Sequence, residues 1–514
     1  MRKFIPVITG LLFVAVCVVA LEYVSLKKTE GNFCYPLDDT FIHMAVSKNL
    51  ALHGIWGISQ EGFVSTSSSP LFTALLAIFF KLFSVTIFAP LFLSCLGTLL
   101  MVIAMSRELK KYSGLTVFSA TVCITGTLFL AAIPAMTLLG MEHTFQIAFT
   151  LFFVHSVATL LTTNEKKFFL SALIWGALMV ATRYENAFVI AAAAGLLMLR
   201  KRFLHAVGVA AAGLAPIIMF GLYAKSQGGF FIPNSIMIKA NQNLGQLLNG
   251  GHSILENSST ISGLLVISIV IALRKYQLKI LDRDFWVLSV FVLSGLMHAV
   301  FASFGWFYRY EAYLIVLGSF QLLKMGLEWW QANRWVGLKS QWLWAAAIFI
   351  LTFNLPLRSL NSMRNSIRAI HNIYDQQYQM GLFMKQHYDQ QVVAANDIGA
   401  ISYFADLKTL DLWGLGNNEV AHARKNFYWN NAFLQKLVTD KKARIAVIYD
   451  IWFDKDLPKP WFKVGMWQMP YNYICGDIKV TWYAMSEEEA VKLRANLGAF
   501  EKQLPADVTF EYFR

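Results

Sequence analysis

Long apolar runs recur along the first 356 residues of the chain and dictate its class of fold. A helix needs about 20 mostly apolar residues to cross the hydrocarbon core of a bilayer. We therefore predict eleven membrane-spanning helices, of which the shorter ones must borrow flanking residues. The predicted spans are residues 4–24, 86–106, 115–134, 145–163, 168–182, 187–199, 203–223, 261–273, 285–303, 312–324 and 342–356.

The composition supports a membrane protein with a polar tail. Of 514 residues, 56% are hydrophobic and 15% are charged, whereas soluble domains have about 25% charged residues. This excludes a water-soluble enzyme, a disordered protein and a nucleic-acid binder. Up to residue 356 there are 25 Lys and Arg against 14 Asp and Glu, and from residue 357 there are 19 against 17. We expect a membrane domain at 1–356, with a first outer loop at 25–85, and a polar domain at 357–514.

The basic residues indicate how the spans cross the membrane, because inner loops carry an excess of Lys and Arg. With the N-terminus inside, 17 of the 25 basic residues lie on the inner side and eight on the outer side. A further span at 70–83 would move the basic loop 107–111 outside, so we expect this stretch to form an interfacial helix. Residues 18–20 weakly resemble a signal cleavage site, but the length of the run favours a retained anchor. The last 158 residues are then outside.

Polar side chains are costly at membrane depth, so the side on which they gather is informative. The first predicted outer loop holds an acidic pair, Asp38 and Asp39, with His43 about one helical turn further on. Each short outer turn carries one glutamate, and Arg-Tyr-Glu occurs twice. The other candidate site residues on the outer side are Glu142, His143, Arg183, Tyr184, Glu185, Lys239, Tyr308, Arg309, Tyr310 and Glu311.

A structural role stands beside each of these assignments. Asp38 or Asp39 can cap the helix expected at 41–53, and His43 can be a packed, hydrogen-bonded side chain. The Arg-Tyr-Glu turns can be internal salt bridges with interfacial tyrosines, and Lys239 can be ordinary loop charge. A functional site is favoured because acids, cations and aromatic residues all gather on one side.

An outward-facing site cannot count on cytoplasmic ATP or nucleotide sugars, so a lipid phosphate is the donor that suits it. A carboxylate takes the proton from an acceptor hydroxyl, and cations stabilise the phosphate leaving group. Asp282 and Asp284 resemble a metal-binding pair, but they lie on an inner loop just before a span, where helix capping is favoured. His252, His298 and His371 have no partner at metal-ligand spacing. The need for a divalent cation stays open.

The ordered set of outer motifs resembles the GT-C superfamily of polyprenyl-phosphate-dependent membrane glycosyltransferases, most closely the branch of bacterial terminal arabinofuranosyltransferases. The resemblance covers nearly the whole chain, but each motif is short and only the ordered set is specific. The matching stretches are Asp38-Asp39-Thr40-Phe41-Ile42, Ser69-Pro70-Leu71, Gly140-Met141-Glu142, Thr182-Arg183-Tyr184-Glu185, Ile232-Pro233-Asn234 with Lys239, Arg309-Tyr310, Asn396-Asp397-Ile398-Gly399 and Leu410-Asp411-Leu412-Trp413-Gly414. Tyr184 and the long serine run 65–69 depart from the family pattern, which bears on the sugar rather than on the reaction class.

This resemblance implies an inverting glycosyltransferase of the bacterial inner membrane with a periplasmic active site. It implies transfer of a pentose such as arabinofuranose, or of a hexose, from a polyprenyl-phosphate donor to a cell-envelope glycan or glycolipid. Asp38 is then the general base with Asp39 as its partner, and Arg183, Lys239 and Arg309 bind the donor phosphate. The implied partners are this donor, this acceptor and membrane lipids, with no nucleic acid.

The alternative function is a lipid-linked sugar flippase or a secondary transporter without transferase activity. Such proteins should show paired halves and charges near the middle of the membrane. This sequence shows no such halves, and its charges lie at the outer ends of the spans. An outward-facing transferase of another group, such as phosphoethanolamine, needs a metal-rich outer domain, and the His and Asp clusters of such a domain are missing.

The outer region 357–514 is predicted to be a mixed α/β domain. Strand-like runs occur at 391–396, 444–449 and 478–483, and a helix is expected at 486–503, opening with a capping box. Its six tryptophans can stack on the rings of an acceptor glycan, pack in a core or contact the membrane surface. Cys34 and Cys475 are the two cysteines on the outer side, a compartment that permits a disulfide between them.

Overall fold

The computed structural model describes residues 4–163, 165–237, 259–333, 351–453, 457–458 and 460–513. Contacts divide the chain into two compact units, each assembled from separate stretches of sequence. We call the first the helical unit; it comprises Met1–Ala20, Leu91–Met219 and Asn243–Arg364. We call the second the mixed unit; it comprises Leu21–Pro90, Phe220–Gln242 and Asn365–Arg514. The predicted domain boundary after residue 356 stays a prediction and does not coincide with this grouping.

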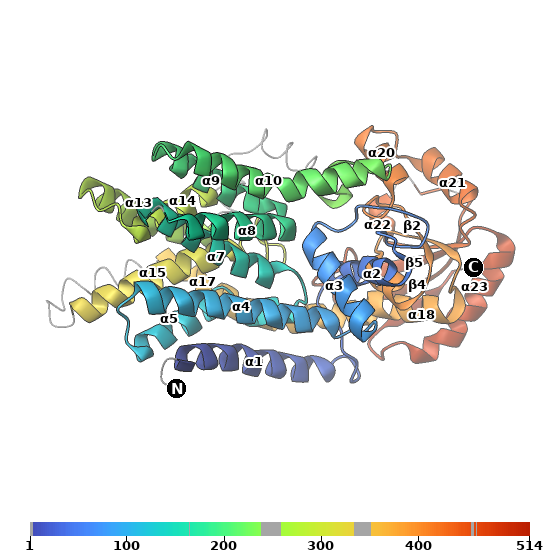
Figure 1. Ribbon diagram of the computed structural model, residues 1–514. Helices are drawn as coiled ribbons and strands as arrows, with labels where there is room; N and C mark the ends of the chain where they lie inside the picture. The colour runs from blue at the N-terminus through green and yellow to red at the C-terminus, as the bar shows by residue number, and fades with distance from the viewer. Residues whose placement is uncertain are drawn as a thin grey trace. The chain divides into compact units, whose positions relative to one another are not determined.

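Most of the chain before the sheet is helical (Figure 1). Among the described residues, six helices are long and apolar enough to cross a membrane by length and composition, so the chain is a multi-pass membrane protein. They are α1 (Ile5–Leu26), α4 (Ala89–Tyr112), α7 (His143–Thr163), α10 (Phe203–Ser226), α13 (Ser259–Gln277) and α14 (Arg283–Phe301).

Further helices overlap other predicted spans. They are α5 (Val117–Leu130), α6 (Ile133–Leu138), α8 (Lys166–Thr182), α9 (Ala187–Leu199) and α15 (Ala312–Ala332). The 3₁₀ turn η2 (Tyr184–Asn186) lies between α8 and α9, and α17 (Asn354–Ile373) shares only its first three residues with the last predicted span. The number of eleven spans stays a prediction, and most of the last one, 342–356, lies outside the described residues. The predicted capping role of Asp282 is confirmed, since its side chain accepts the N–H of Phe285 in the first turn of α14.

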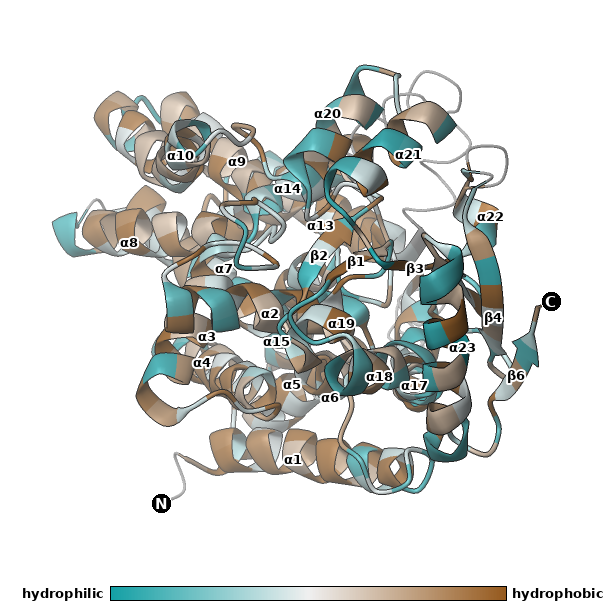
Figure 2. Ribbon diagram, turned by 90° about the vertical axis from the view of Figure 1, so that its right-hand side faces the viewer, coloured by the Kyte–Doolittle hydropathy of each residue, from teal (hydrophilic) through white to brown (hydrophobic). Residues whose placement is uncertain are grey.

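Burial separates the helices of the helical unit into central and peripheral ones. In α7, eighteen side chains are buried, and α8, α14 and α15 pack against it. Many apolar side chains of α1 and α10 remain exposed instead: for example, Val16 is 66% exposed and Met219 is 71% exposed. Figure 2 shows both helices as predominantly hydrophobic. A helix that is apolar all round is unstable in water, so these surfaces fit contact with lipid.

The mixed unit begins with two helices that precede its sheet in sequence by more than three hundred residues. They are α2 (Asp38–His53) and α3 (Pro70–Phe83). The helix predicted at 70–83 is therefore confirmed, and its place in the membrane interface stays a prediction. The helix predicted at 41–53 starts earlier than expected, because Asp38 and Asp39 form part of its first turn.

A six-stranded sheet forms the centre of the mixed unit, in the order β2-β1-β3-β5-β4-β6. Its strands are β1 (Val392–Ala395), β2 (Lys408–Asp411), β3 (Ile445–Ile448), β4 (Phe462–Gln468), β5 (Lys479–Ala484) and β6 (Thr509–Tyr512). β1 pairs in parallel with β2 and β3, and the remaining pairs are antiparallel. The three predicted strands are confirmed as β1, β3 and β5.

Helices accompany the sheet of the mixed unit. They are a π-helical turn η3 (Tyr374–Tyr378), α18 (Gln379–His387), α19 (Gly399–Phe404), α20 (Asn418–Lys425), α21 (Asn431–Asp440), α22 (Asp450–Phe453), α23 (Glu487–Phe500) and a 3₁₀ turn η5 (Glu501–Gln503). The capping prediction for the last helix is confirmed, since the Ser486 side chain accepts the N–H of Glu489.

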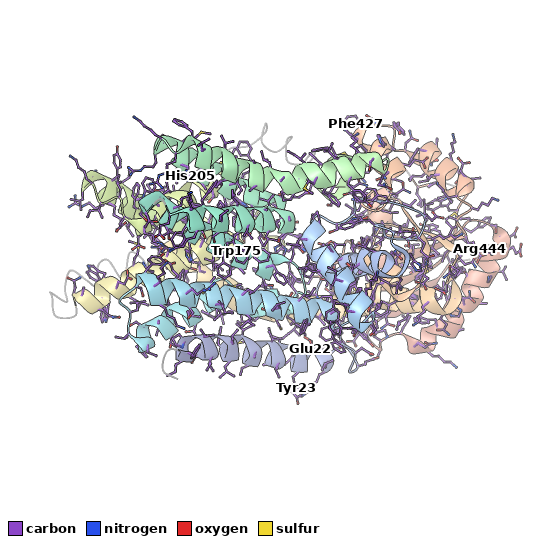
Figure 3. The ribbon with its side chains drawn as sticks, viewed as in Figure 1. Glu22, Tyr23, Trp175, His205, Phe427 and Arg444 are labelled. Atoms are coloured by element: carbon purple, nitrogen blue, oxygen red, sulfur yellow. The ribbon has the colours of Figure 1, made fainter. Side chains whose placement is uncertain are left out.

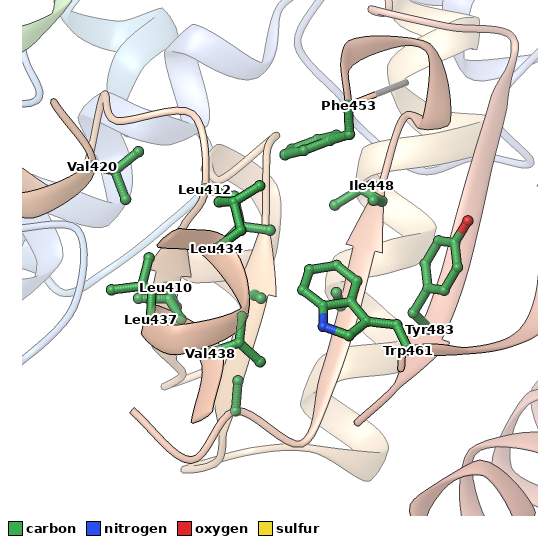
Figure 4. Packing of buried hydrophobic residues seen from close by; sticks show 13 residues of the cluster. Leu410, Leu412, Val420, Leu434, Leu437, Val438, Ile448, Phe453, Trp461 and Tyr483 are labelled. Carbon is green, nitrogen blue, oxygen red and sulfur yellow. The ribbon is translucent and has the colours of Figure 1, made fainter. Parts of the chain in front are cut away.

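The sheet buries two apolar layers. Leu434 and Leu437 of α21 pack with Ile448 and Tyr483 in the cluster shown in Figure 4. Trp482 precedes Tyr483 along β5 and points to the opposite face, because side chains alternate along a strand. There it packs against Phe383 of α18 at a ring-centroid distance of 4.6 Å.

Candidate active-site residues

Asp38 binds a helix that lies far from it in sequence. Its Oδ2 accepts the backbone N–H of Gly399 at 2.7 Å, and its Oδ1 accepts the N–H of Ala400 at 2.8 Å. These donors are the first two residues of α19, so Asp38 caps α19 rather than its own helix, whose N-cap residue Leu37 makes no side-chain cap bond. A Cβ on Gly399 would lie 2.3 Å from the Asp38 carbonyl oxygen, so only glycine fits there.

A second carboxylate, Asp397, lies near Asp38. Its Oδ2 accepts hydrogen bonds from Tyr449 Oη at 2.6 Å and from Gln377 Nε2 at 2.7 Å. Burial and the Asp397 charge raise the pKa of Asp38 well above its ordinary value, although its two backbone N–H bonds act in the opposite direction. Burial and the Asp39 charge likewise raise the pKa of Asp397. We call Asp38, Asp39 and Asp397 the acid cluster.

Two thiols adjoin the acid cluster. Cys34 and Cys475 are free in the structure. Cys475 donates to Gln377 Oε1 at 3.3 Å, so it shares a partner with Asp397. Burial, together with the negative charge of the nearby carboxylates, raises the pKa of both thiols well above its ordinary value.

Other motifs from the sequence meet in the mixed unit. The backbone N–H of Asn234 donates to the Ser65 carbonyl at 3.0 Å, and its side-chain amide donates to the Gly414 carbonyl at 3.4 Å. Asp411 accepts the backbone N–H of Trp413 at 2.7 Å and that of Gly416 at 2.5 Å. The serine run, the Ile-Pro-Asn motif and the tail motif are therefore joined by hydrogen bonds.

His43 has the hydrogen-bonded surroundings expected of a structural residue. It is buried, and its Nδ1 lies 3.1 Å from Ser67 Oγ and 3.4 Å from Thr73 Oγ1. Thr73 Oγ1 also donates to Ser67 Oγ at 2.8 Å. This network joins α2 to the serine run and to α3.

Arg183 in the helical unit binds two glutamates. Its Nη1 donates to Glu142 Oε1 at 2.9 Å, its Nε donates to Glu185 Oε2 at 3.1 Å, and its Nη2 also contacts Glu185. The ring of Tyr310 lies 5.5 Å from this guanidinium and 5.3 Å from that of Arg309. The two Arg-Tyr-Glu turns therefore contact each other through Tyr310.

A third arginine belongs to the same group, and the sequence did not single it out. Arg358 of α17 donates to Glu311 Oε1 and to the Tyr308 carbonyl, both at 2.6 Å. Glu311 also accepts the Gly305 N–H at 2.9 Å. Arg309 is buried, and its Nη1 lies 2.8 Å from Met141 Sδ. We call Arg183, Arg309, Arg358, Glu142, Glu185 and Glu311 the arginine–glutamate cluster; its formal charges balance.

The remaining candidates vary in their surroundings. His143 is buried beside Glu142, and its Nδ1 lies 3.2 Å from Gln146 Oε1. Tyr184 is partly exposed on the turn η2. Lys239 lies outside the described residues. Within the described ranges, no group of three or more His, Cys, Asp or Glu side chains is arranged to hold a metal ion.

The six tryptophans of the tail fall into two sets. Trp461, Trp467 and Trp482 are buried, so core packing explains them. Trp413, Trp429 and Trp452 are half-buried and adjacent: the Trp413 and Trp452 rings are 4.5 Å apart, and the Trp413 and Trp429 rings are 5.9 Å apart. The guanidinium of Arg424 lies 3.6 Å from the Trp413 ring.

Some of these contacts had a signal in the sequence and some had none. Asp397 and Gly399 stand in a motif that matched the GT-C pattern, yet nothing local to them shows that they contact Asp38. Gln377 lies in the π-helical turn η3 and Tyr449 directly follows β3, and Arg358 begins a polar stretch. Their partners lie between 20 and 361 residues away along the chain, so only folding brings them together.

Solved structures show the same fold. The structure of ArnT from Cupriavidus metallidurans in the apo state has a TM-score of 0.53 and 11% identity, covering 93% of this chain and 98% of that chain. The same ArnT bound to undecaprenyl phosphate gives a TM-score of 0.52 with equal identity and coverage. An Archaeoglobus fulgidus oligosaccharyltransferase in complex with zinc and sulfate has a TM-score of 0.42 and 10% identity, covering 95% and 77%; this likeness is too weak to support an argument.

Sequence comparisons add little to this result. Residues 368–485 match a family described only as a domain of unknown function, DUF8728. A search of curated proteins finds no match. At 11% identity, the likeness to ArnT shows the fold alone: the chain has a GT-C fold.

Proposed function

We propose that this protein is an inverting glycosyltransferase that uses a polyprenyl-phosphate-linked sugar. The observation that carries the proposal is the acid cluster, which joins the first loop to the tail motif through Asp38, Gly399 and Ala400. A GT-C fold, an adjacent acid pair and a separate group of buried arginines fit transfer from a lipid phosphate. The ArnT structure with undecaprenyl phosphate supplies an example of this fold with such a lipid bound.

In the proposed reaction, a carboxylate of the acid pair takes the proton of the acceptor hydroxyl. The acceptor oxygen then attacks the anomeric carbon of the sugar, and the bond from that carbon to the phosphate oxygen breaks with inversion. Asp38 is the proposed base, because two backbone N–H donors fix the orientation of its carboxylate. Asp39 is its proposed partner.

The leaving polyprenyl phosphate gains negative charge, which cations must stabilise. Arg183, Arg309 and Lys239 are the proposed phosphate-binding residues. The structure gives Arg183 two glutamate partners, so a phosphate would have to compete with them. The alternative is that Arg183 has a scaffolding role, and mutants must distinguish this role from phosphate binding.

The acceptor is proposed to be a cell-envelope glycan or glycolipid. Trp413, Trp429 and Trp452 form the half-buried aromatic surface that would stack on its sugar rings. We further propose eleven spans, an inside N-terminus, an outside C-terminus and a site on the periplasmic face of a bacterial inner membrane. The arabinofuranosyltransferase branch is the proposed subfamily.

The test is a transfer assay with the purified full-length protein. It is incubated in detergent with a synthetic polyprenyl-phosphate pentose or hexose and a glycolipid fraction from cells that lack the protein. We expect a mass increase of one sugar on the acceptor and release of polyprenyl phosphate. If the protein instead moves the lipid-linked sugar across vesicles without cleaving it, the flippase alternative is correct.

A further inference from the structure

A cavity in the helical unit is lined by residues other than those proposed for sugar transfer. Its volume is ≈ 330 Å³. Its lining includes Arg107, Lys111, Tyr112, His155, Lys167 and Trp175. Figure 3 labels Trp175, which lies on α8. None of these six residues belongs to the acid cluster or to the arginine–glutamate cluster.

The cavity lies at one end of a group of packed helices. α4 ends at Tyr112, α8 begins at Lys166 and α14 begins at Arg283, and each contributes lining residues near that terminus. α7 contributes His155 and Thr159, which lie in its C-terminal half. In the proposed topology this is the inner end of the helices, where anionic lipid headgroups are abundant.

The charge of the cavity is positive. Glu108 is the one acid among the described residues of the lining. Arg283 neutralises it through contacts from both Nη atoms, that from Nη2 to Oε2 being 2.7 Å long. Three further cations line the cavity: Arg107, Lys111 and Lys167. Lys167 also contacts the exposed Glu165 at 2.5 Å. An anion can therefore bind without displacing a buried partner.

The lining residue His155 has a buried ring nitrogen without a hydrogen-bond partner among the described residues. His155 is buried, and its Nδ1 lies 3.3 Å from Glu108 Oε2. Its Nε2 is buried and has no hydrogen-bond partner among the described residues. If Nδ1 donates to Glu108, Nε2 is a bare acceptor. The complementary group is a hydroxyl on the ligand.

The surroundings favour a lipid over a soluble phosphate ester. Phe152 and Trp175 line the cavity as a stacked pair with centroids 4.5 Å apart. Leu170 and Ile174 of the same helix α8 are each 59% exposed, as expected of side chains that face acyl chains. A headgroup in the cavity would thus be continuous with an apolar helix surface.

We propose that this cavity binds the headgroup of an anionic phospholipid whose phosphate diester carries a free hydroxyl. Arg107, Lys111 and Lys167 contact the phosphate, and His155 Nε2 accepts the hydroxyl. Basic pockets between membrane helices are suited to such headgroups.

The probe is dioleoyl phosphatidylglycerol, titrated onto the full-length protein in neutral detergent, with the lipid-bound fraction measured by native mass spectrometry. Dioleoyl phosphatidylcholine gives the background. The test variant is Lys111→Gln with Lys167→Gln. The control is Lys110→Gln with Lys166→Gln, which removes equal charge from the neighbouring positions, outside the cavity lining.

We expect the wild type and the control to bind phosphatidylglycerol equally, and the test variant to bind it at least about tenfold more weakly. Melting curves without lipid show whether each variant is folded; if the test variant is not, Lys111→Gln alone is used. Equal binding by test and control variants, or no preference of the wild type over phosphatidylcholine, overturns the proposal.

A second arm tests the hydroxyl. Dioleoyl phosphatidylmethanol has the same charge but no hydroxyl, so the wild type should bind it more weakly, and His155→Phe should remove the difference. Equal binding of the two lipids by the wild type overturns the role of His155. Glycerol 1-phosphate tests whether the natural ligand is a lipid or a soluble phosphate ester. If it competes with phosphatidylglycerol at equal concentration, the site belongs to a soluble phosphate ester and the lipid assignment is overturned.

Discussion

A carboxylate whose two oxygens each accept a backbone N–H is held in one orientation, and Asp38 is in that position. The sequence predicted that an acid pair stands at the start of a helix, and that either acid could cap that helix. It could not predict that Asp38 binds Gly399 and Ala400, because those contacts cross more than 360 residues of chain. A sequence motif identifies the residue types, but only the packing of the folded chain determines which of these residues contact each other.

The two arginines differ in their partners, and conservative variants should separate their roles. Arg183→Lys keeps the charge but cannot bind Glu142 and Glu185 at once, so we expect a lower melting temperature as well as slower transfer. Arg309→Lys should slow transfer by about tenfold or more with a smaller change in melting temperature. Transfer rates and melting curves measure both. Full activity in both variants would leave only the salt-bridge role.

Asp375 should make stability depend on pH. Burial and the charges of Asp507 and Glu30 raise its pKa to about 8, against about 3.9 for an unfolded chain. Between these values the folded state binds more protons than the unfolded state, so stability falls as pH rises from about 4 to 8. Asp375→Asn should flatten the melting temperature over this window, and the exposed Asp440→Asn should not. An unchanged pH profile for Asp375→Asn would contradict this account.

At the scale of elements, hydrophobic periodicity and capping residues were sufficient to predict the helices and strands whose sequence signal is local. Ser486 caps α23 and Asp282 caps α14 as predicted, and the strands β1, β3 and β5 were all found. The strands β2, β4 and β6 were missed. β6 is short and largely exposed, so it lacks the apolar signal that identifies a strand, and its pairing with β4 places it in the sheet.

The close approach of α2 and α19 makes its own prediction. Gly399→Ala places a Cβ 2.3 Å from the Asp38 carbonyl oxygen and 2.6 Å from its Oδ2. The two helices must separate, so we expect loss of transfer together with a lower melting temperature. Gly326→Ala is the control, since nothing lies within 4 Å of its added Cβ. Wild-type transfer by Gly399→Ala would show that this contact is not needed.

At the scale of the whole molecule, composition predicted the class of protein, and the apolar runs predicted most helices. The sequence alone could not predict the compact units, because the mixed unit combines Leu21–Pro90 and Phe220–Gln242 with the C-terminal residues. The contact between Asp38 and α19 accounts for part of this grouping. Hydrophobic patterns specify which residues are buried and leave the partners of each element open.

The proposed topology follows from the distribution of charge over the whole chain and has a direct test. Reporter fusions after Arg200 and after Arg514 should report opposite compartments, with Arg200 inside. A cytoplasmic fluorescent reporter and a periplasmic phosphatase together measure this. The same compartment at both positions would mean that the number of spans is wrong.

The central claim is that the acid pair performs general-base catalysis of sugar transfer. The most direct measurement is the transfer rate of Asp38→Asn and of Asp39→Asn from a synthetic polyprenyl-phosphate sugar, with a melting curve for each. Asparagine cannot take the proton, so Asp38→Asn should lose about 10²–10⁴-fold in rate, while the weakened cap of α19 should cost only about 1 kcal/mol of stability. Asp39→Asn should lose less, and the reverse ranking would exchange the two roles. Near-wild-type transfer by both folded variants would contradict the account.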